Sequence, residues 1–367
     1  MRRIKKEEWE VRMERSIGIS SRVKRTKDGE ARPTLVAIRT GEVLTALELE
    51  TEQDELDFVL QELQAGDLVA MVLGGCGDNF AFALSKRGEQ LGQGTKVVRV
   101  PSFVLKQERG EGQKDKDHII LSHLVQSKPE IFSEVVLRER KTIRVRECLR
   151  VRTDAMKARI ACEQRLHQRL TGQIFCSETG LYPEGGIEKA YDELKANDVT
   201  LIALLKEEAK SERELERAVG ETEVFKIVFG QIEGCGFKIA SRLIAVVGDI
   251  RRFETPPKLK KYLGVHVLPD GRFPRRRSGE VANWNDEARK ALFLLADQFN
   301  RRPDSEWGKY LRLCKVRLRE KHPVKVQANG KWHYTDGHIH KMASWRCMSR
   351  FVEWLFVEWW KLERERK

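Results

Sequence analysis

Residues 229–279 read FGQIEGCGFKIASRLIAVVGDIRRFETPPKLKKYLGVHVLPDGRFPRRRSG, and they hold the most informative pattern in the chain. Gly234 and Gly236 stand directly before apolar residues at helical spacing, which predicts a tight turn that opens into a helix. Glycine lets a main chain approach a ligand closely, and the first amides of a helix favour an anion. The pattern predicts a helical hairpin that docks on a nucleic-acid backbone. A plain tight turn is the alternative.

Basic residues surround this turn. Between Gly234 and Lys290 there are 13 Lys and Arg against 6 Asp and Glu. A run of three arginines directly precedes Ser278 and Gly279, and each guanidinium can bond two phosphate oxygens. The alternative is a solvated basic loop with a turn serine. The predicted nucleic-acid-binding residues are Gly234, Gly236, Lys238, Arg242, Arg275, Arg276 and Arg277.

The composition of the whole chain agrees with a polyanionic partner. Its 367 residues carry a formal net charge of +13, which favours nucleic acid over acidic-surface chemistry. The seven cysteines form no Cys-x-x-Cys pair, so neither a zinc site nor a disulfide framework is indicated. No signal peptide and no apolar run of 18 residues is apparent. We therefore expect a cytoplasmic, nucleoid-associated protein that has no membrane partner.

Residues 1–130 show the pattern of a mixed α/β domain. Alternating or continuous apolar runs predict strands at 17–19, 34–38, 43–50, 67–72 and 96–100, the first three as a β-meander. Helices are predicted at 52–63 and around Phe80 and Leu84. Asp115 and Asp117 stand at the start of a further helix, where acidic residues usually serve the helix dipole.

The rest of the chain reads as helical. Residues 131–225 predict two long helices joined by a loop at 180–186, as a coiled-coil pair that serves as a dimer arm or an intramolecular spacer. Residues 226–310 predict a helix-hairpin-helix-like domain, and residues 311–367 a basic and aromatic helical tail whose aromatic residues form core. His333, His338 and His340 lack carboxylate or cysteine partners at metal-ligand spacing, so polar contacts with nucleic acid are the preferred interpretation over a metal site. The fold class is thus α/β plus α.

Four motifs together resemble the insertion-sequence one-ten transposases, the group that includes the pilin-gene invertases. The motifs lie at residues 232–236, 248–253, 259–264 and 278–279. The amino-terminal strand pattern and residues 114–117 are similar to that family's RuvC-like, RNase H-like domain. The resemblance covers most of residues 15–310.

The resemblance implies a DNA transposase or site-specific recombinase. In that family four acidic residues bind a divalent metal such as Mg²⁺, and a serine, matched here by Ser278, becomes covalently joined to double-stranded DNA. Some members use a structured guide RNA, and recombination implies a homo-oligomer, a dimer or tetramer. The matching metal ligands here are Asp115 and Asp117, with His118 beside them.

The chain departs from the family at two acidic positions. Ser20 and Val72 stand where the resemblance expects carboxylates, and valine offers no ligand to a hard cation. A second hypothesis is therefore a catalytically degenerate nucleic-acid-binding descendant of such a transposase. A third, a junction nuclease acting through the RuvC-like fold alone, is the least favoured for the same reason.

Overall fold

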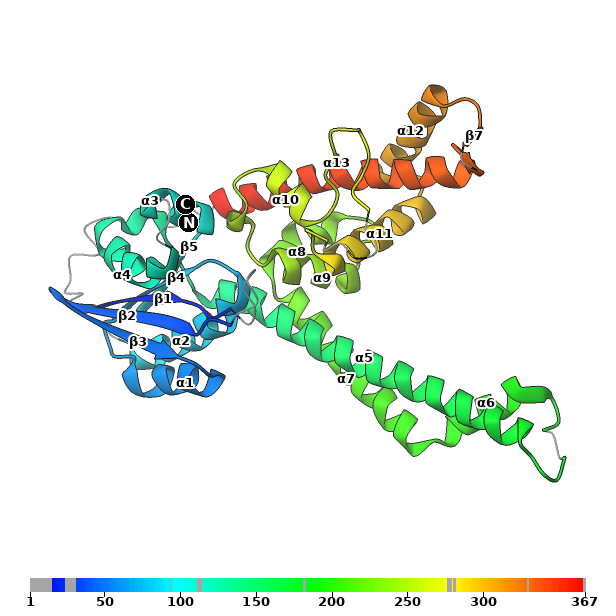
Figure 1. Cartoon of the computed structure of the whole chain (residues 1–367), viewed down its shortest axis with the longest axis horizontal. Coiled ribbons are helices and arrows are strands. Elements are labelled where there is room, and N and C mark those ends of the chain that lie inside the picture. Colours follow the sequence, from blue (N-terminus) through cyan, green and yellow to red (C-terminus); the bar gives the residue numbers. More distant parts are fainter. Residues whose placement is uncertain are drawn as a thin grey trace.

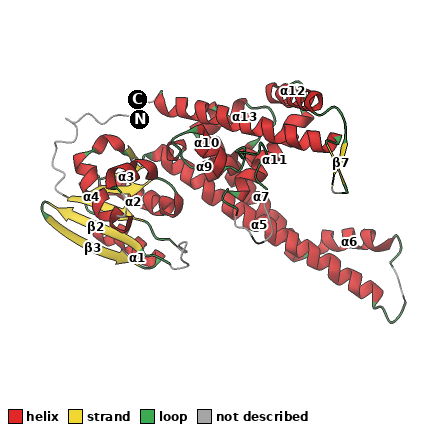
Figure 2. Cartoon of the chain, turned by 45° about the horizontal axis from the view of Figure 1, so that its top comes forward, coloured by secondary structure: helices red, strands yellow, loops and turns green. Residues whose placement is uncertain are grey.

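The computed structural model describes residues 15–23, 31–92, 94–110, 114–180, 183–275, 279, 282–328 and 330–365. These residues form a sheet with covering helices, a long helical arm and a helical body that contains the carboxy-terminal helix (Figure 1). Apart from one small hairpin, the strands are confined to one end of the molecule (Figure 2). No helix within the described ranges is long and apolar enough to cross a membrane.

The sheet has six strands in the order β3-β2-β1-β4-β5-β6. The first three form the predicted antiparallel meander, whereas β1, β4 and β5 run parallel and β6 returns antiparallel. The five strands predicted from hydrophobic patterning are confirmed. Their bounds are β1 (Arg15–Ser20), β2 (Thr34–Thr40), β3 (Val43–Leu49), β4 (Leu68–Val72) and β5 (Lys96–Val100), and the sixth strand, β6 (Ser133–Glu134), was not predicted.

Helices cover both faces of this sheet, and each face has its own apolar core. Successive strand residues point to opposite faces, so Val69 and Met71 pack on one side and Leu68 and Ala70 on the other. Burial on both faces explains why β4 is a continuous apolar run. The first core is closed by a π-helical turn (Phe58–Glu62) and α2 (Asp78–Leu91), and the second by α3 (Ser102–Arg109) and α4 (Asp117–Ser127). Helix α1 (Glu52–Asp57) leads into the π-helical turn and has no buried residue.

Helix α4 is pressed against β1 at a glycine. A Cβ on Gly18 would lie 1.9 Å from the carbonyl oxygen of His118, which no side chain tolerates. Ser16 Oγ also donates to the Ser122 carbonyl at 2.8 Å. Because β1, β4 and β5 are parallel, their carboxyl ends share one edge, and this contact brings the start of α4 to that edge.

The arm contains three helices, not the two predicted. After α5 (Leu137–Phe175) the return path divides into α6 (Gly186–Asn197) and α7 (Val199–Gly220). Asp198 causes the division because its side chain caps α7, accepting from the Leu201 amide at 2.7 Å. Ion pairs from Arg152 and Arg159 to Glu208 join α5 to α7. The arm projects away from both other parts (Figure 1).

The helical body comprises α8 (Glu223–Ile227), α9 (Phe237–Val247), α10 (Pro256–Tyr262), α11 (Asp286–Arg301), α12 (Glu306–Lys321) and α13 (Asp336–Arg364). One apolar core joins these helices, so residues 311–365 pack as part of the same body as residues 226–310. The aromatic helix is core, as predicted: Phe351 is fully buried and Trp359 is 2% exposed. A hairpin that was not predicted, β7 (Val326–Ala328) and β8 (Lys331–His333), precedes α13.

Candidate nucleic-acid interface

The first candidate region is the sheet edge, by which we mean the carboxyl ends of β1 and β4 together with residues 114–118. Asp117, the first residue of α4, is buried, and Arg109 Nη1 donates to its two carboxylate oxygens at 2.7 and 2.8 Å. Asp115 is exposed and lies 3.7 Å from Arg32 Nη1. The same arginine donates to Ser20 Oγ at 3.5 Å. Both predicted metal ligands therefore already face a guanidinium.

These residues do not fit a Mg²⁺ centre. A hard divalent cation is held by several oxygen ligands, mainly carboxylates, and Val72 at the end of β4 supplies none. His118 is buried, and burial lowers the pKa of its imidazole. Across the described ranges no group of three or more His, Cys, Asp or Glu could hold a metal ion. We assign no chemical step to a metal at this edge.

The Gly-x-Gly turn forms as predicted, and α9 begins directly after Gly236. Gly234 has φ +85°, and a Cβ there would lie 3.0 Å from Cβ of Gln298 on α11, so packing inside the protein already requires this glycine. Lys238 Nζ lies 2.5 Å from a Glu212 carboxylate oxygen. Arg242 Nη1 lies 3.5 Å from Glu287. Both predicted phosphate contacts thus have acidic partners within the chain.

The largest candidate region is a cleft of about 1580 Å³, which we call the aromatic cleft. It lies between the loop before α11, the end of α12, the β7-β8 hairpin and the start of α13. Among the described residues, six Lys or Arg and one carboxylate, that of Asp270, line it. Its cations are Arg272, Arg275, Arg289, Lys321, Lys341 and Arg346, and its rings are those of His266, Phe273, Trp284, His322, Trp332, His333, Tyr334, His338 and Trp345.

Three rings of the cleft are stacked in parallel. The His322 and Tyr334 centroids are 3.9 Å apart with planes 5° apart, and Tyr334 and His338 are 5.6 Å apart at 4°. Tyr334 has φ +56°, the sole positive φ of a non-glycine residue in the described chain. That conformation costs free energy, and such strain clusters at functional sites.

Hydrogen bonding fixes this stack. His338 Nδ1 accepts from the Tyr334 amide at 3.1 Å. Burial, followed by the nearby His333 and Arg275, lowers the pKa of His338, so its ring is neutral at neutral pH and its Nδ1 is free to accept. The strained tyrosine and the histidine therefore hold each other in place.

Arg289 fixes the opposite wall. Its guanidinium carbon lies 4.6 Å from the Trp284 ring centroid and 4.9 Å from that of Trp345. It also donates to the Pro274 carbonyl at 2.6 Å. Cation–π contact on two rings holds the loop before α11 against α13.

Ser278, Arg276 and Arg277 lie outside the described residues, so their predicted roles stay predictions. The chain on either side of them is described, and both Arg275 and Ala282 line the aromatic cleft. His333 and His338 line the cleft too, whereas His340 does not. The structure therefore gathers Arg275 with two of the three predicted histidines, and leaves Lys238 and Arg242 outside the cleft lining.

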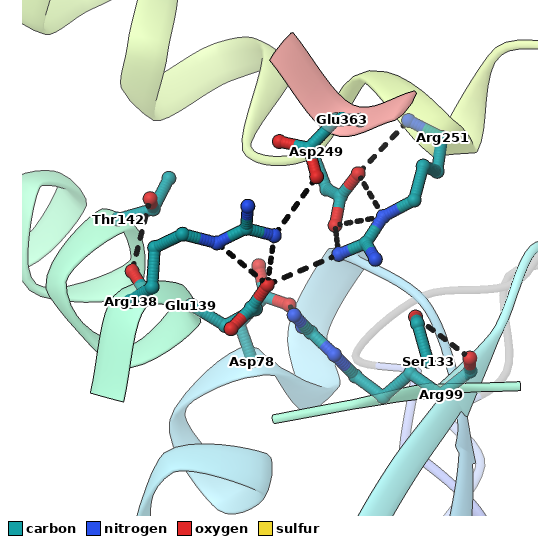
Figure 3. Close-up of polar contacts among 9 residues, drawn as sticks. All are labelled: Asp78, Arg99, Ser133, Arg138, Glu139, Thr142, Asp249, Arg251 and Glu363. Carbon is teal, nitrogen blue, oxygen red and sulfur yellow. Dashed lines mark hydrogen bonds and ion pairs between the residues drawn. The ribbon is translucent and has the colours of Figure 1, made fainter. Parts of the chain in front are cut away.

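Sequence reasoning missed a buried cluster of ion pairs where the three parts of the molecule meet, which we call the ionic junction (Figure 3). The carboxylate of Asp78 forms ion pairs with two arginines. Its Oδ1 lies 2.8 Å from Nη1 of Arg99, and its Oδ2 lies 2.6 Å from Nη1 of Arg146. Arg251 lies 3.3 Å from Glu139 and its Nε donates to Asp249 at 2.9 Å. The cluster contains four carboxylates and four guanidinium groups, those of Asp78, Arg99, Arg138, Glu139, Arg146, Asp249, Arg251 and Glu363.

The charges of the junction stabilise one another. Burial alone would raise the pKa of Asp249, but Arg251 and then Arg99 outweigh it and lower that pKa to about 2. Burial raises the pKa of Glu363. Asp249 and Arg251 belong to the second of the four motifs, 248–253, and the structure shows that this motif joins the helical body to the sheet and to α5. The motif was visible in the sequence, but the partners of Asp249 and Arg251 were not.

The comparisons with known proteins support the class of transposases of mobile elements for this chain. Residues 228–312, which run from the end of α8 into α12, match the Transposase IS116/IS110/IS902 family, and this match confirms the resemblance to the insertion-sequence one-ten transposases. No curated protein matches the chain. The matched segment contains the Gly-x-Gly turn, Ser278 and the loop wall of the aromatic cleft, whereas the hairpin and α13 lie beyond it.

Proposed function

We propose that the protein binds double-stranded DNA at the ends of its element and cuts and rejoins strands with Ser278 as the nucleophile. Its hydroxyl oxygen would attack a phosphorus atom and form a serine–DNA phosphodiester, while the departing oxygen of the sugar takes up a proton and is released as a hydroxyl. Reversal of this exchange onto another strand would rejoin the DNA without an external energy source. The RuvC-like assignment of the sheet domain belongs to the same proposal, supported by its strand order.

One observation carries the proposal. Arg275, three residues before Ser278 in the sequence, and Ala282, four residues after it, line a cleft whose described lining carries six Lys or Arg and one carboxylate. A concentration of guanidinium and ammonium groups attracts a phosphodiester and stabilises the negative charge that grows on it during attack. These cations support Ser278 as the candidate nucleophile for phosphoryl transfer.

The experiment looks for a covalent protein–DNA adduct. Purified protein is incubated with supercoiled DNA carrying the element's own ends, with and without Mg²⁺ and with and without RNA transcribed from the element's flanks. Denaturing gels then reveal any labelled DNA that stays on the protein. We expect an adduct with wild type and with the control Ser127→Ala, an exposed serine at the end of α4, and none with Ser278→Ala. An adduct that survives Ser278→Ala overturns the assignment.

A second candidate is a catalytically degenerate descendant that only binds nucleic acid. The observation in its favour is the sheet edge, where Arg109 and Arg32 face the two carboxylates that the family would use for metal. Tight binding to element ends without an adduct under any of the conditions above would support it.

Assembly belongs to the proposal as well. Recombination holds two DNA partners together, and the arm carries exposed apolar side chains such as Val199 and Phe175, which are 81% and 72% exposed. We propose that the arm contributes to a dimer or tetramer. Light scattering that gives the mass of a monomer both free and on DNA would rule this out.

A further inference from the structure

From the geometry of the aromatic cleft we infer that it holds an unpaired stretch of nucleic acid, with bases stacked on the rings of the hairpin and α13 and phosphates on the surrounding cations. The inference rests on the proposed function and adds to it a second kind of bound strand. It concerns residues that lie beyond the matched transposase segment, in particular Trp332, Tyr334 and His338.

The size of the cleft argues for a polymer. Pockets for small molecules measure roughly 300–1,000 Å³, and this one measures about 1580 Å³. A site of this size, lined by both rings and cations, suits several linked nucleotides.

The charges argue for phosphate. Arg275, Lys321, Lys341 and Arg346 make no ion pair with any carboxylate in the described ranges, although surface lysines and arginines elsewhere in the molecule commonly do. Like charges gathered without a counter-charge repel one another, so this arrangement destabilises the empty protein. An anionic ligand removes that cost.

The rings argue for bases that are not paired. Trp332 is 61% exposed and lines the cleft from a two-stranded hairpin, where it contributes little to the core. The neighbouring stack of His322, Tyr334 and His338 is held in parallel by a strained backbone. Bases within a duplex cover one another's faces, so only an unpaired base can extend such a stack. Stacking tolerates any base, and we expect little sequence preference.

The test measures binding of labelled oligonucleotides by fluorescence anisotropy, with full-length protein in a Ser278→Ala background so that no reaction intervenes. The probes are single-stranded DNA of 12 nucleotides, the same strand with abasic sites at its centre, the matched duplex, and single-stranded RNA of the same sequence. The variants are Trp332→Ala and Trp332→Phe. The control is Leu60→Ala, which shortens an exposed apolar side chain in the π-helical turn of the sheet domain.

Stacking of one base on an aromatic ring changes affinity by roughly 5- to 150-fold. We expect Trp332→Ala to weaken binding of the single strand about tenfold and to leave the duplex and the abasic strand within twofold of their original affinity. Trp332→Phe should restore most of the loss, and Leu60→Ala should change nothing. Tighter binding of the DNA strand or of the RNA strand identifies which of the two the cleft receives.

Two results would overturn the inference: equal binding of the base-containing and abasic strands by wild type, or unchanged single-strand binding by Trp332→Ala. Neither depends on the covalent adduct. An adduct through Ser278 with no effect at Trp332 refutes the stacking site and leaves the proposed function standing. Base-dependent binding without a covalent adduct supports the stacking site and contradicts the proposed function of Ser278.

Discussion

The sheet edge and the aromatic cleft are both rich in charge, but they differ in where the opposite charge comes from. At the edge, Asp117 and Asp115 face Arg109 and Arg32 of the same chain. Among the described residues that line the cleft, one carboxylate stands against six cations. Charges that neutralise each other inside a protein serve its stability, whereas charges left uncompensated are retained for a ligand. This difference is our reason for proposing that nucleic acid binds in the cleft and not at the edge.

The largest effect that we expect is the salt dependence of binding. If the six cleft cations meet six phosphates, affinity for nucleic acid should fall about 10³-fold between 50 and 200 mM salt. The free energy of unfolding should change little over the same range, because the ion pairs of the edge and junction are buried and weakly screened. Binding curves and denaturant curves recorded in the same buffers check both halves. A binding constant that does not change with salt concentration would contradict our view that the charges of the cleft, unlike those of the edge, are neutralised by a ligand.

The next largest effect that we expect is a loss of stability when the ion pair of the sheet edge is removed. Arg109→Ala should lower the free energy of unfolding by about 3–5 kcal/mol, because it leaves the largely buried Asp117 carboxylate without its partner. The control is an arginine of the cleft: Arg272 is 81% exposed and its nearest carboxylate is 3.9 Å away, so Arg272→Ala should change stability by less than about 0.5 kcal/mol.

Urea denaturation of both variants provides the measurement. Adding Asp117→Asn to Arg109→Ala should recover part of the loss, since it removes the unpaired charge. Equal stability of Arg109→Ala and wild type would contradict our description of a self-neutralised edge.

The ionic junction resembles the sheet edge, because its carboxylates are paired with arginines of the same chain. Its contribution to stability should be lost at low pH. The folded-state pKa of Asp249 is about 2, below the value of about 3.9 for an unfolded chain, so its contribution is complete above pH 4 and is lost as the pH falls toward 2. The amount is about 2 kcal/mol. The effect of Glu363 on stability has the opposite sign, because burial raises the pKa of its carboxyl in the folded protein. Its contribution is present at low pH and is lost as the pH rises through that raised pKa.

Unfolding free energies of wild type and Asp249→Asn, measured from pH 5 to pH 2, test this contribution. Wild type should lose about 2 kcal/mol more than the variant below pH 4. Parallel pH profiles of the two proteins would show that Asp249 has no special partner in solution.

Local patterns made the sheet predictable. The continuous apolar run in 68–72 reflects burial on both faces of the sheet, and the alternation in 43–49 predicted β3 although only Leu49 of that strand is buried. The hairpin was missed although its signal was present: Asn329-Gly330 stands between two short extended runs, the dipeptide that two-residue turns favour. The division of α6 from α7 was missed because a capping aspartate inside a helical pattern resembles any exposed polar residue.

The sites depend on tertiary convergence, and no local pattern encodes that. The aromatic cleft gathers residues from 266–275, 282–289, 321–322 and 332–346, and the junction gathers Asp78, Glu139, Asp249 and Glu363 from four distant segments. Sequence reasoning found Arg275 and the histidines by composition, but it also chose Lys238 and Arg242, whose carboxylate partners lie on other helices. A basic residue becomes a candidate ligand contact only once its neighbours are known.

The smallest expected effect concerns Mg²⁺ and bears directly on the sheet edge. A ligand that binds only the folded state raises the free energy of unfolding by RT ln(1 + [L]/Kd), so a site with a Kd of about 0.1 mM would add about 2.7 kcal/mol at about 10 mM Mg²⁺. We expect a rise of less than about 0.3 kcal/mol in the absence of nucleic acid, because Asp117 is engaged by Arg109 and Val72 offers no oxygen. The measurement is urea denaturation with MgCl₂ against NaCl of equal ionic strength, so that screening is the same in both series. A rise near 2 kcal/mol that disappears in Asp117→Asn would show that the edge binds metal after displacing Arg109, and would move the edge from the self-neutralised region to the ligand-binding one.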